Sequence, residues 1–546
     1  MNSLVADNNL YLSEVNHLTG EMLNLEFLKM STVPSIPEFY ASQSIFITGA
    51  TGFLGKILVE KLIRSCPEVK CIYLLIRPKK GKDPQERLDE ILDSQLFEKV
   101  KTQNPDFKRK CKAIEGDIIK EDLGLDQGDH DLLTKEVSVV FHSAATIKFD
   151  EEMKLSVDMN IGGVHSMLEF CKTLPKLVSF VHISTAYANC DRNKIDEEVY
   201  EPPLKPRQLL DACSWMDAET LNTLTPQIIG SRPNTYTYTK SVAEFLIKEE
   251  AGSLPVAIFR PSIVGATYVE PVRGWVDNVN GPTGLLAAIG KGVLRIMKGD
   301  FNATADIIPA DFATNMLLAV GWYTAVHKPK SLMVFNCTSG GLNRFTWGQM
   351  ERLSYEYLMK NPLENIARVP NAKFTKSVLW HDTNVLFDHM LPAYLMDMYM
   401  WISGRRRMFV RLQEKLRKAV SSLEFFTARQ WEFSHDNLLM LERLMSPDDK
   451  KNFNFNPKSI HWPTYMEAYC LGTKRYVLKE HISALPNARK ALVRLQRLNM
   501  LFQVVVFMVV WRLLVKRVTV ARVLWNMILG WAGRLLQRVP GIARST

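Results

Sequence analysis

The sequence predicts an α/β protein: a doubly wound, parallel, Rossmann-like sheet with a substrate lobe, then a helical C-terminal domain and a membrane segment. Three observations predict this architecture. A glycine-rich turn joins an apolar run at 44–48 to a helical pattern at 54–64. Further short apolar runs alternate with helical stretches, which is typical of parallel strands buried on both faces. A basic, apolar tail over 488–538 follows a region rich in Leu, Met and Trp.

The 546 residues are enough for two or three domains. Residues 1–40 are mixed polar and predict an N-terminal arm, and the sheet domain is expected over 41–369. After the strand at 44–48, β-branched and aromatic runs predict strands at 71–76, 111–116, 137–142, 177–184 and 254–259. Between them the apolar spacing predicts helices at 54–64, 87–100, 151–173 and 238–250.

The second half of the chain has a different composition. Residues 261–345 contain several Gly/Pro turns and are expected to complete a substrate-covering lobe. From about 370 to 475 strand signals are few, so we expect a helical C-terminal domain.

Charge is distributed unevenly. The net charge is +10, but residues 471–546 carry 14 Lys and Arg against one acidic residue, Glu480, so the first 470 residues are nearly neutral. This distribution argues against a nucleic-acid enzyme and favours a catalytic body held at an anionic lipid surface. The eight cysteines form no CxxC pair or zinc-spaced cluster, so we expect reduced thiols and no metal.

The turn Thr48-Gly-Ala-Thr-Gly-Phe-Leu-Gly55 has the glycine spacing of a dinucleotide-binding loop. Gly49 allows the sharp turn, Gly52 allows a pyrophosphate to approach the backbone, and Gly55 allows the helix to pack closely on the sheet. The phosphates would meet the free N–H groups and the positive end of the helix.

The second strand ends in a basic residue, Arg77, where an NADH enzyme usually has Asp or Glu. An arginine can hold a 2′-phosphate with two charge-assisted hydrogen bonds, so this position favours NADPH. Asp117 and Ile118 follow the third strand, where the adenine would lie, although Asp117 could equally cap a helix. The fourth strand ends in small residues, among them Ala144, as is needed where a cofactor crosses the sheet edge.

Tyr236 and Lys240 are four residues apart on a predicted helix and share one face. An ammonium group beside a phenol favours the phenolate, so we expect a lowered tyrosine pKa and a role in protonating a carbonyl during hydride transfer. Tyr238 lies two residues from Lys240 and points elsewhere. Ser184 and Thr185 end a strand, and either hydroxyl could donate to the substrate carbonyl.

Three further polar residues lie near these motifs, and the sequence does not assign any of them a catalytic role. Lys148 could reach the nicotinamide end or only a surface carboxylate. His142 and His182 lie within strand runs, so we interpret them as core histidines with satisfied hydrogen bonds and not as bases.

These motifs together resemble the alcohol-forming fatty acyl-CoA reductases of animals, over residues 40–475. The resemblance rests on TGATGFLGKILVEKLIRSCP, YLLIRPKKG, FHSAATIKF, HISTAYANC, YTYTKSVAE, RPSIVGA and, at 381–401, HDTNVLFDHMLPAYLMDMYMW. It implies that 41–369 is an NADPH-binding reductase domain of the extended short-chain dehydrogenase type. It also implies catalysis by Tyr236 and Lys240, with Thr185 as the hydroxyl preferred over Ser184. The implied cofactor contacts are Gly49, Thr51, Gly52, Phe53, Gly55, Arg77, Pro261 and Ile263.

The implied reaction uses NADPH to reduce a long-chain acyl-CoA to an aldehyde, with loss of CoA, and then to a primary alcohol. Two alternatives remain. One is an NADP-dependent hydroxysteroid or sugar-nucleotide dehydrogenase, which usually lacks a helical domain such as 370–475. The other is a non-catalytic membrane scaffold, which would be expected to lose Tyr236 or Lys240.

Residues 498–511 carry no charge, Arg512 interrupts them, and the next apolar stretch contains Arg522. A straightforward span needs about 20 mostly apolar residues. The tail therefore predicts a short span, a hairpin or helices lying in the interface. The N-terminus has no signal-peptide pattern, so we expect the catalytic domain to face the cytosol at the endoplasmic reticulum or peroxisome membrane. Oligomeric state is open.

Overall fold

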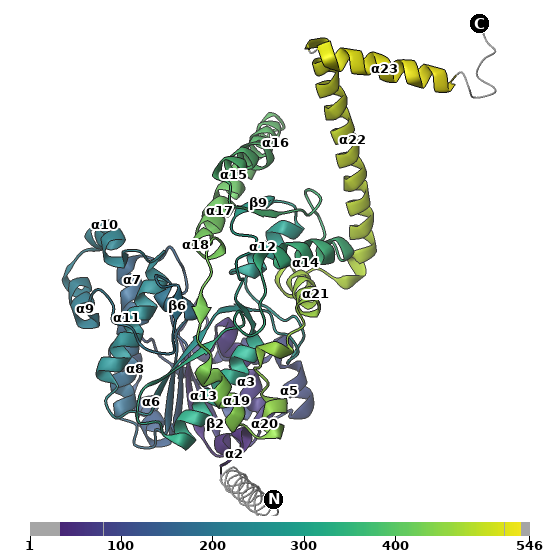
Figure 1. Cartoon of the computed structure of the whole chain (residues 1–546). Helices are drawn as coiled ribbons and strands as arrows, with labels where there is room; N and C mark the ends of the chain where they lie inside the picture. The colour runs from purple at the N-terminus through teal and green to yellow at the C-terminus, as the bar shows by residue number, and fades with distance from the viewer. Residues whose placement is uncertain (1–32, 80, 518, 537–546) are drawn as a thin grey trace, which may run out of the picture.

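A computed structural model describes residues 33–79, 81–517 and 519–536. Its centre is a seven-stranded, all-parallel sheet in the order β11-β7-β5-β4-β1-β2-β3 (Figure 1). The strands are β1 Ser44–Thr48, β2 Cys71–Ile76, β3 Cys111–Glu115, β4 Val139–His142, β5 Ser179–Ile183, β7 Val256–Pro261 and β11 Met333–Cys337. The strand order reverses between β1 and β4, and a ligand of such a sheet binds at the carboxyl ends of the strands at this point. The predicted fold class is confirmed.

Alternate side chains of the strands enter two separate apolar layers. Ile45 and Ile47 of β1 pack with helices α3 and α13, whereas Phe46 points to the other face, toward α8 and α11. All five residues of β1 are buried, which explains why its sequence is a continuous apolar run and not an alternating one. The helices are α3 Phe53–Ser65, α8 Gly163–Lys172, α11 Thr235–Glu250 and α13 Ala310–His327.

Smaller elements complete these two layers. They are α2 Ile36–Tyr40, α6 Gln127–Glu136, α7 Met153–Val157, the π-helix η4 Asp158–Gly162, α9 Pro206–Trp215 and α10 Ala218–Ile229. Because α7, η4 and α8 run on without a break, the helix predicted at 151–173 is confirmed as one bent helix. Most of the predicted arm, residues 1–32, lies outside the described residues.

The single helix predicted at 87–100 is wrong. The chain forms α4 Pro84–Leu92, a short 3-10 helix Gln95–Phe97 and α5 Glu98–Gln103. Ser94 breaks the helix: its backbone is extended, and its hydroxyl donates to the Ile91 carbonyl at 2.7 Å. The break lets Phe97 turn inward and stack on Phe107.

Residues 261–345 form a covering lobe only in part. Helix α13 and strand β11 return to the main sheet, so this stretch also supplies the sheet's edge strand. The remainder forms small elements near the carboxyl ends of the strands: β8 Ile263–Gly265, α12 Pro282–Gly290, β9 Ile296–Lys298 and β10 Ile307–Pro309.

The helical region predicted from 370 begins earlier, since the chain after 345 is mainly helical. It contains α14 Trp347–Lys360, α15 Val378–Asn384, the π-helix η6 Val385–Met390, α16 Leu391–Ile402, α17 Phe409–Ser421, α18 Glu424–Thr427, α19 Asp436–Leu444, α20 Pro447–Asn452 and α21 Trp462–Gly472, with two short strands, β12 Lys373–Thr375 and β13 Glu432–Phe433. Leu438, Leu441 and Tyr465 belong to the same apolar core as β1. The region therefore shares the core of the sheet, and the boundaries expected at 369 and 475 stay predictions.

The tail forms α22 Leu485–Arg517 and α23 Thr519–Leu536, which project away from the body (Figure 1). Helix α22 is long and apolar enough to cross a membrane, and none of its most apolar stretch is buried against the protein. The guanidinium of Arg522 donates to the carbonyls of Val515 and Lys516 and so joins the two helices. Residues 537–538 of the predicted segment lie outside the described residues.

Candidate active site

A cavity of about 1640 Å³ opens at the carboxyl ends of the strands, where their order reverses. Every residue that the sequence predicted for cofactor binding or catalysis lines it: Gly49, Thr51, Gly52, Phe53, Gly55, Arg77, Asp117, Ile118, Ala144, Ser184, Thr185, Tyr236, Lys240, Pro261 and Ile263. Parallel strands bring residues nearly 200 positions apart to one edge, which explains this convergence.

The glycine turn has a conformation that its sequence requires. Gly49 has φ +74°, and a Cβ there would lie 2.7 Å from the Ala144 nitrogen. Gly52 is the N-cap of α3, and no side chain caps that helix end. Its first N–H groups are therefore open to phosphate oxygens. Gly55 has a different role from the one predicted, since a Cβ there would collide with the Gly49 carbonyl and not with the sheet.

Arg77 and Asp117 form an ion pair at the edge of the cavity beside the ends of β2 and β3, with 3.3 Å between Nη1 and Oδ2. The Arg77 side chain is about half exposed, so its guanidinium can also reach a ligand. The second Asp117 oxygen accepts from the Ile119 N–H at 3.3 Å. Asp117 therefore orients Arg77 and does not cap the following 3-10 helix, whose N-cap is Lys120.

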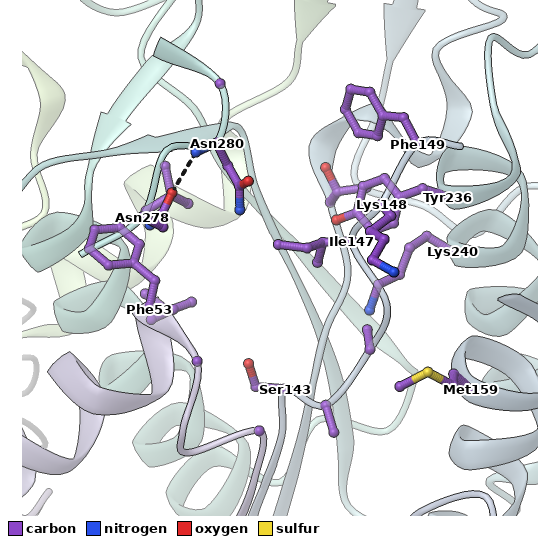
Figure 2. A pocket seen from close by; sticks show the side chains of 18 of the residues that line it. Phe53, Ser143, Ile147, Lys148, Phe149, Met159, Tyr236, Lys240, Asn278 and Asn280 are labelled. Atoms are coloured by element: carbon purple, nitrogen blue, oxygen red, sulfur yellow. Dashed lines mark hydrogen bonds between the residues drawn. The ribbon is translucent and has the colours of Figure 1, made fainter. Parts of the chain in front are cut away.

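Tyr236 and Lys240 lie on the first turns of α11, whose N-terminus is capped by the Asn234 side chain. Both face the cavity, across from Phe53, Asn278 and Asn280 (Figure 2). Lys240 is 3% exposed, and its ammonium donates to the Ile183 carbonyl at 2.7 Å.

The expected lowering of the tyrosine pKa is wrong. Burial raises the pKa of the Tyr236 phenol to about 12, and a hydrogen bond with the Thr185 hydroxyl only partly opposes this. The Lys240 ammonium donates to the Ile183 carbonyl, and it is not among the causes of this shift. Burial also lowers the pKa of Lys240 to about 8, opposed by the nearby Glu244 carboxylate. The site therefore holds a neutral phenol that is a proton donor.

The two hydroxyls at the end of β5 differ in their contacts. The Thr185 oxygen accepts from the Tyr187 N–H at 3.3 Å and also contacts Tyr236. The Ser184 hydroxyl is buried with no hydrogen-bond partner among the described residues. A buried hydroxyl that lines a cavity and has no hydrogen-bond partner can donate a hydrogen bond to a ligand. Tyr238, the competing phenol, is fully buried and does not line the cavity.

The two strand histidines are core residues, as predicted, but they are not satisfied. His142 Nδ1 lies 2.8 Å from the Thr48 hydroxyl, while its Nε2 and both nitrogens of His182 find no partner among the described residues. Burial, with Lys240 nearby, lowers the pKa of His142 to about 3, so the ring is neutral. Lys148 lines the cavity and also pairs with Glu151 at 3.2 Å, which leaves both of its roles open.

Several cavity residues escaped sequence reasoning. One of them is Phe149, whose ring stacks on Tyr236 with 5.9 Å between centroids. Helices α17 and α18, more than 150 residues beyond Tyr236, supply one wall through Leu416, Val420, Leu423 and Phe426. The amphipathic pattern of 409–421 was a visible signal, but nothing local indicated which element it covers.

Comparison with known proteins identifies the family. The NAD-binding profile described as male sterility protein matches residues 47–317, and a second profile of the same description matches 388–480. Fatty acyl-CoA reductase 1 of Xenopus laevis is 43% identical over 502 residues, which is 92% of this chain and 98% of the relative. The chain belongs to the fatty acyl-CoA reductase family. Human fatty acyl-CoA reductase 1 is 42% identical over the same shares, and cattle fatty acyl-CoA reductase 2 is 44% identical.

Solved structures support the fold of this family member. The reductase domain of a nonribosomal peptide synthetase from Mycobacterium tuberculosis aligns with a TM-score of 0.54 at 17% identity, covering 82% of this chain and 95% of that one. The terminal reductase domain of the myxalamid pathway aligns at 0.50 and 19%, covering 81% and 93%.

The cavity fits a nicotinamide dinucleotide by its own geometry. Gly49 and Gly52 form a cradle that a Cβ at either position would narrow, and the uncapped N-terminus of α3 faces this cradle. The Ser184 hydroxyl has no partner among the described residues and can bind a ligand. Together with the matched NAD-binding profile, this makes the cavity a nicotinamide cofactor site with a phenol at its reactive end.

Proposed function

We propose that this protein reduces long-chain fatty acyl-CoA to a primary alcohol with NADPH, releasing CoA by way of an aldehyde. The observation that carries the proposal is one cavity that brings the glycine turn together with Tyr236, Lys240 and Thr185, in a chain of the fatty acyl-CoA reductase family. No buried cysteine lines this cavity among the described residues, which fits a route without a thiol nucleophile.

Each of the two reductions would take one hydride from an NADPH held at this site, so NADP+ would leave and a second NADPH would bind between them. Thr185 and Ser184 donate hydrogen bonds to the oxygen of the thioester carbonyl and so stabilise the charge that develops there. Loss of the CoA thiol from the resulting thiohemiacetal leaves an aldehyde in the same place. Tyr236 then gives its proton to the aldehyde oxygen as the second hydride arrives, which a neutral phenol can do at pH 7.

Lys240 holds the reactive end in position. Its ammonium is fixed by the Ile183 carbonyl and faces the cavity, so it can donate a further hydrogen bond to the ribose of a bound cofactor. Tyr236 and Lys240 share one face of α11, so the charge of Lys240 would favour the phenolate left after proton transfer.

The pH dependence of kcat/KM for NADPH should reveal the lowered pKa of Lys240. Because the pKa of Lys240 is lowered to about 8, the ammonium loses its proton above that pH, and kcat/KM for NADPH should fall there. An unperturbed lysine would keep its charge to about pH 10.4. The measurement is kcat/KM for NADPH from pH 6 to 10 at saturating acyl-CoA. In Lys240→Arg the falling limb should move beyond the tested range, and a limb that stays in place would assign it to another group.

We further propose that the cofactor is NADPH, bound through Arg77. Arg77→Ala should weaken NADPH binding about 30- to 100-fold, since it removes a charge-assisted contact to the 2′-phosphate. NADH lacks that phosphate and serves as the internal control, with binding nearly unchanged. Fluorescence titration of both nucleotides provides the measurement. An equal loss of affinity for NADH and NADPH would refute the proposed contact between Arg77 and the 2′-phosphate.

We propose that α22 anchors the protein in a membrane with the catalytic domain in the cytosol, at the endoplasmic reticulum or the peroxisome. Its length and its apolar sequence support this placement, as does the exposure of its most apolar stretch, none of which is buried against the body. Among the described residues α22 alone is long and apolar enough to span, so we favour a single span over a hairpin of two spans.

One experiment tests the proposed reaction. Membranes containing the protein are incubated with NADPH and acyl-CoA of several chain lengths, and the lipid products are identified together with free CoA. The expected result is a primary alcohol and one CoA for each two NADPH consumed. Oxidation of NADPH only with a steroid or sugar nucleotide would replace this function with that of a dehydrogenase.

A further inference from the structure

Helix α16 presents an apolar stripe to solvent. Leu391, Leu395, Met398 and Ile402 follow one another at helical spacing on one side, with exposed fractions of 43%, 52%, 52% and 71%. Trp401 beside them is 67% exposed. Single exposed apolar residues need no explanation, but a continuous stripe on an ordered helix indicates a surface that is covered by something.

The opposite side of α16 is fixed to the start of α17, and the base of the helix is fixed to the body. The Asp397 carboxylate accepts hydrogen bonds from the backbone N–H groups of 408–410, at 2.8 to 3.0 Å, and ties the returning chain to the helix. At the base of α16, His389 Nε2 accepts from the Arg295 N–H at 3.2 Å. The exposed stripe therefore belongs to a held hairpin, formed by α16, the turn 403–408 and α17, and not to a fraying end.

The hairpin also carries a basic cluster. Arg405, Arg406 and Arg407 are exposed in the turn, and residues 405–418 contain seven basic residues against one acidic residue, Glu414. Tyr394, Tyr399 and Trp401 add exposed aromatic rings with polar edges. Exposed apolar side chains, interfacial aromatic rings and clustered arginines together match an anionic lipid surface and not the apolar face of another protein.

Figure 1 shows that α16 and α22 project from the same end of the molecule. A membrane that holds α22 would therefore face α16. With 12 residues, α16 is about 18 Å long and too short to cross a hydrocarbon core of about 30 Å. We propose that α16 lies in the headgroup interface of an anionic membrane, with its apolar stripe toward the acyl chains and Arg405–Arg407 on the phosphates.

The hairpin connects this surface to the active-site cavity. Its second helix, α17, is the one whose Leu416 and Val420 line the cavity wall. Docking of α16 would bring the wall of the cavity to the membrane. If the enzyme acts on long acyl chains, as proposed above, both the acyl chain of its substrate and its alcohol product dissolve in that membrane. The docking itself rests on the exposed surface alone and is tested without turnover.

The test uses full-length protein in vesicles of phosphatidylcholine and phosphatidylserine, with an environment-sensitive fluorophore on Leu395→Cys. Labelling is selective because all eight native cysteines are buried. A nitroxide lipid labelled near the headgroup should quench this fluorophore about twofold or more, and one labelled near the bilayer centre should quench it less. Gln103→Cys on α5, exposed at a site far from the hairpin in Figure 1, is the matched control and should not respond.

Replacing all three of Arg405→Gln, Arg406→Gln and Arg407→Gln should remove about half or more of the quenching in phosphatidylserine vesicles. Quenching at Leu395→Cys no greater than at Gln103→Cys would overturn the proposal. So would crosslinking between copies at Leu395→Cys without lipid quenching, because it would make the stripe an interface between copies. Quenching without alcohol formation would refute the proposed function while leaving the docking intact.

Discussion

Tyr236→Phe is expected to lower turnover by about 10³-fold or more, while NADPH binding stays nearly unchanged. Among the described residues, two tyrosines line the cavity, Tyr236 and Tyr187. Tyr236 lies at the catalytic end, with Thr185 and Lys240. Tyr187 points its ring into an aromatic cluster with Phe426 and Trp431, so it does not replace Tyr236. The measurements are single-turnover reduction of acyl-CoA and fluorescence titration of NADPH.

Tyr238→Phe is the matched control for this prediction. It removes the same hydroxyl from the same helix, two residues away, at a position that is buried outside the cavity. Turnover should remain near normal. If Tyr236→Phe kept full turnover, the proton would have to come from another group, such as Ser184 or water.

Arg260→Leu is expected to lower the free energy of unfolding by about 3 to 5 kcal/mol. The Arg260 guanidinium on β7 binds the Glu244 carboxylate on α11 through two bonds of 2.8 and 2.7 Å, and both side chains are fully buried. It also donates to the carbonyls of Asp196 and Glu198. Losing the arginine leaves the Glu244 carboxylate buried with only the Asn189 amide as a side-chain donor, and it removes a donor from two part-buried carbonyls, which explains the large cost. Chemical denaturation or the thermal midpoint provides the measurement.

Two variants test the cause of this loss. Arg109→Leu removes an arginine from a surface pair with Asp106 in which both side chains are mostly exposed, and it should cost less than about 1 kcal/mol. The double variant Arg260→Leu with Glu244→Leu should recover part of the loss, since it leaves no buried charge without a partner. No recovery would mean that Arg260 stabilises the fold through the two backbone carbonyls and not through the ion pair.

The buried pair also has a consequence for the site. Glu244 is one helical turn beyond Lys240 on α11, and Arg260 is the residue before Pro261 on the strand that ends at the cavity. The ion pair therefore locks the catalytic helix to the strand at the nicotinamide end of the cavity. Nothing in the local sequence around 260 distinguishes this arginine from a surface one, and only the sheet register reveals its partner.

Local patterns were sufficient for the elements whose signals lie in a few adjacent residues. The continuous apolar runs at 71–76 and 177–184 predicted buried strands, and the glycines at 49, 52 and 55 predicted a phosphate turn. The spacing of Tyr236 and Lys240 predicted one shared helix face. Ser94 was the local signal that the prediction of a single helix at 87–100 overlooked.

Other features depend on contacts between distant segments. The pKa of Tyr236 is raised because burial disfavours the phenolate, and this burial is not visible in the spacing of two residues. The cavity wall from α17 and the shared core of β1 with Leu438 are also long-range contacts.

By itself the sequence determined the family, the α/β sheet, the cofactor turn and the residues that can do the chemistry, because backbone conformation and side-chain chemistry are written in short stretches of chain. Only the tertiary structure decided the protonation of the phenol, the wall of the cavity and the exposed stripe on α16. Burial and electric fields come from every neighbouring segment at once, and the folded chain alone sets which segments are neighbours.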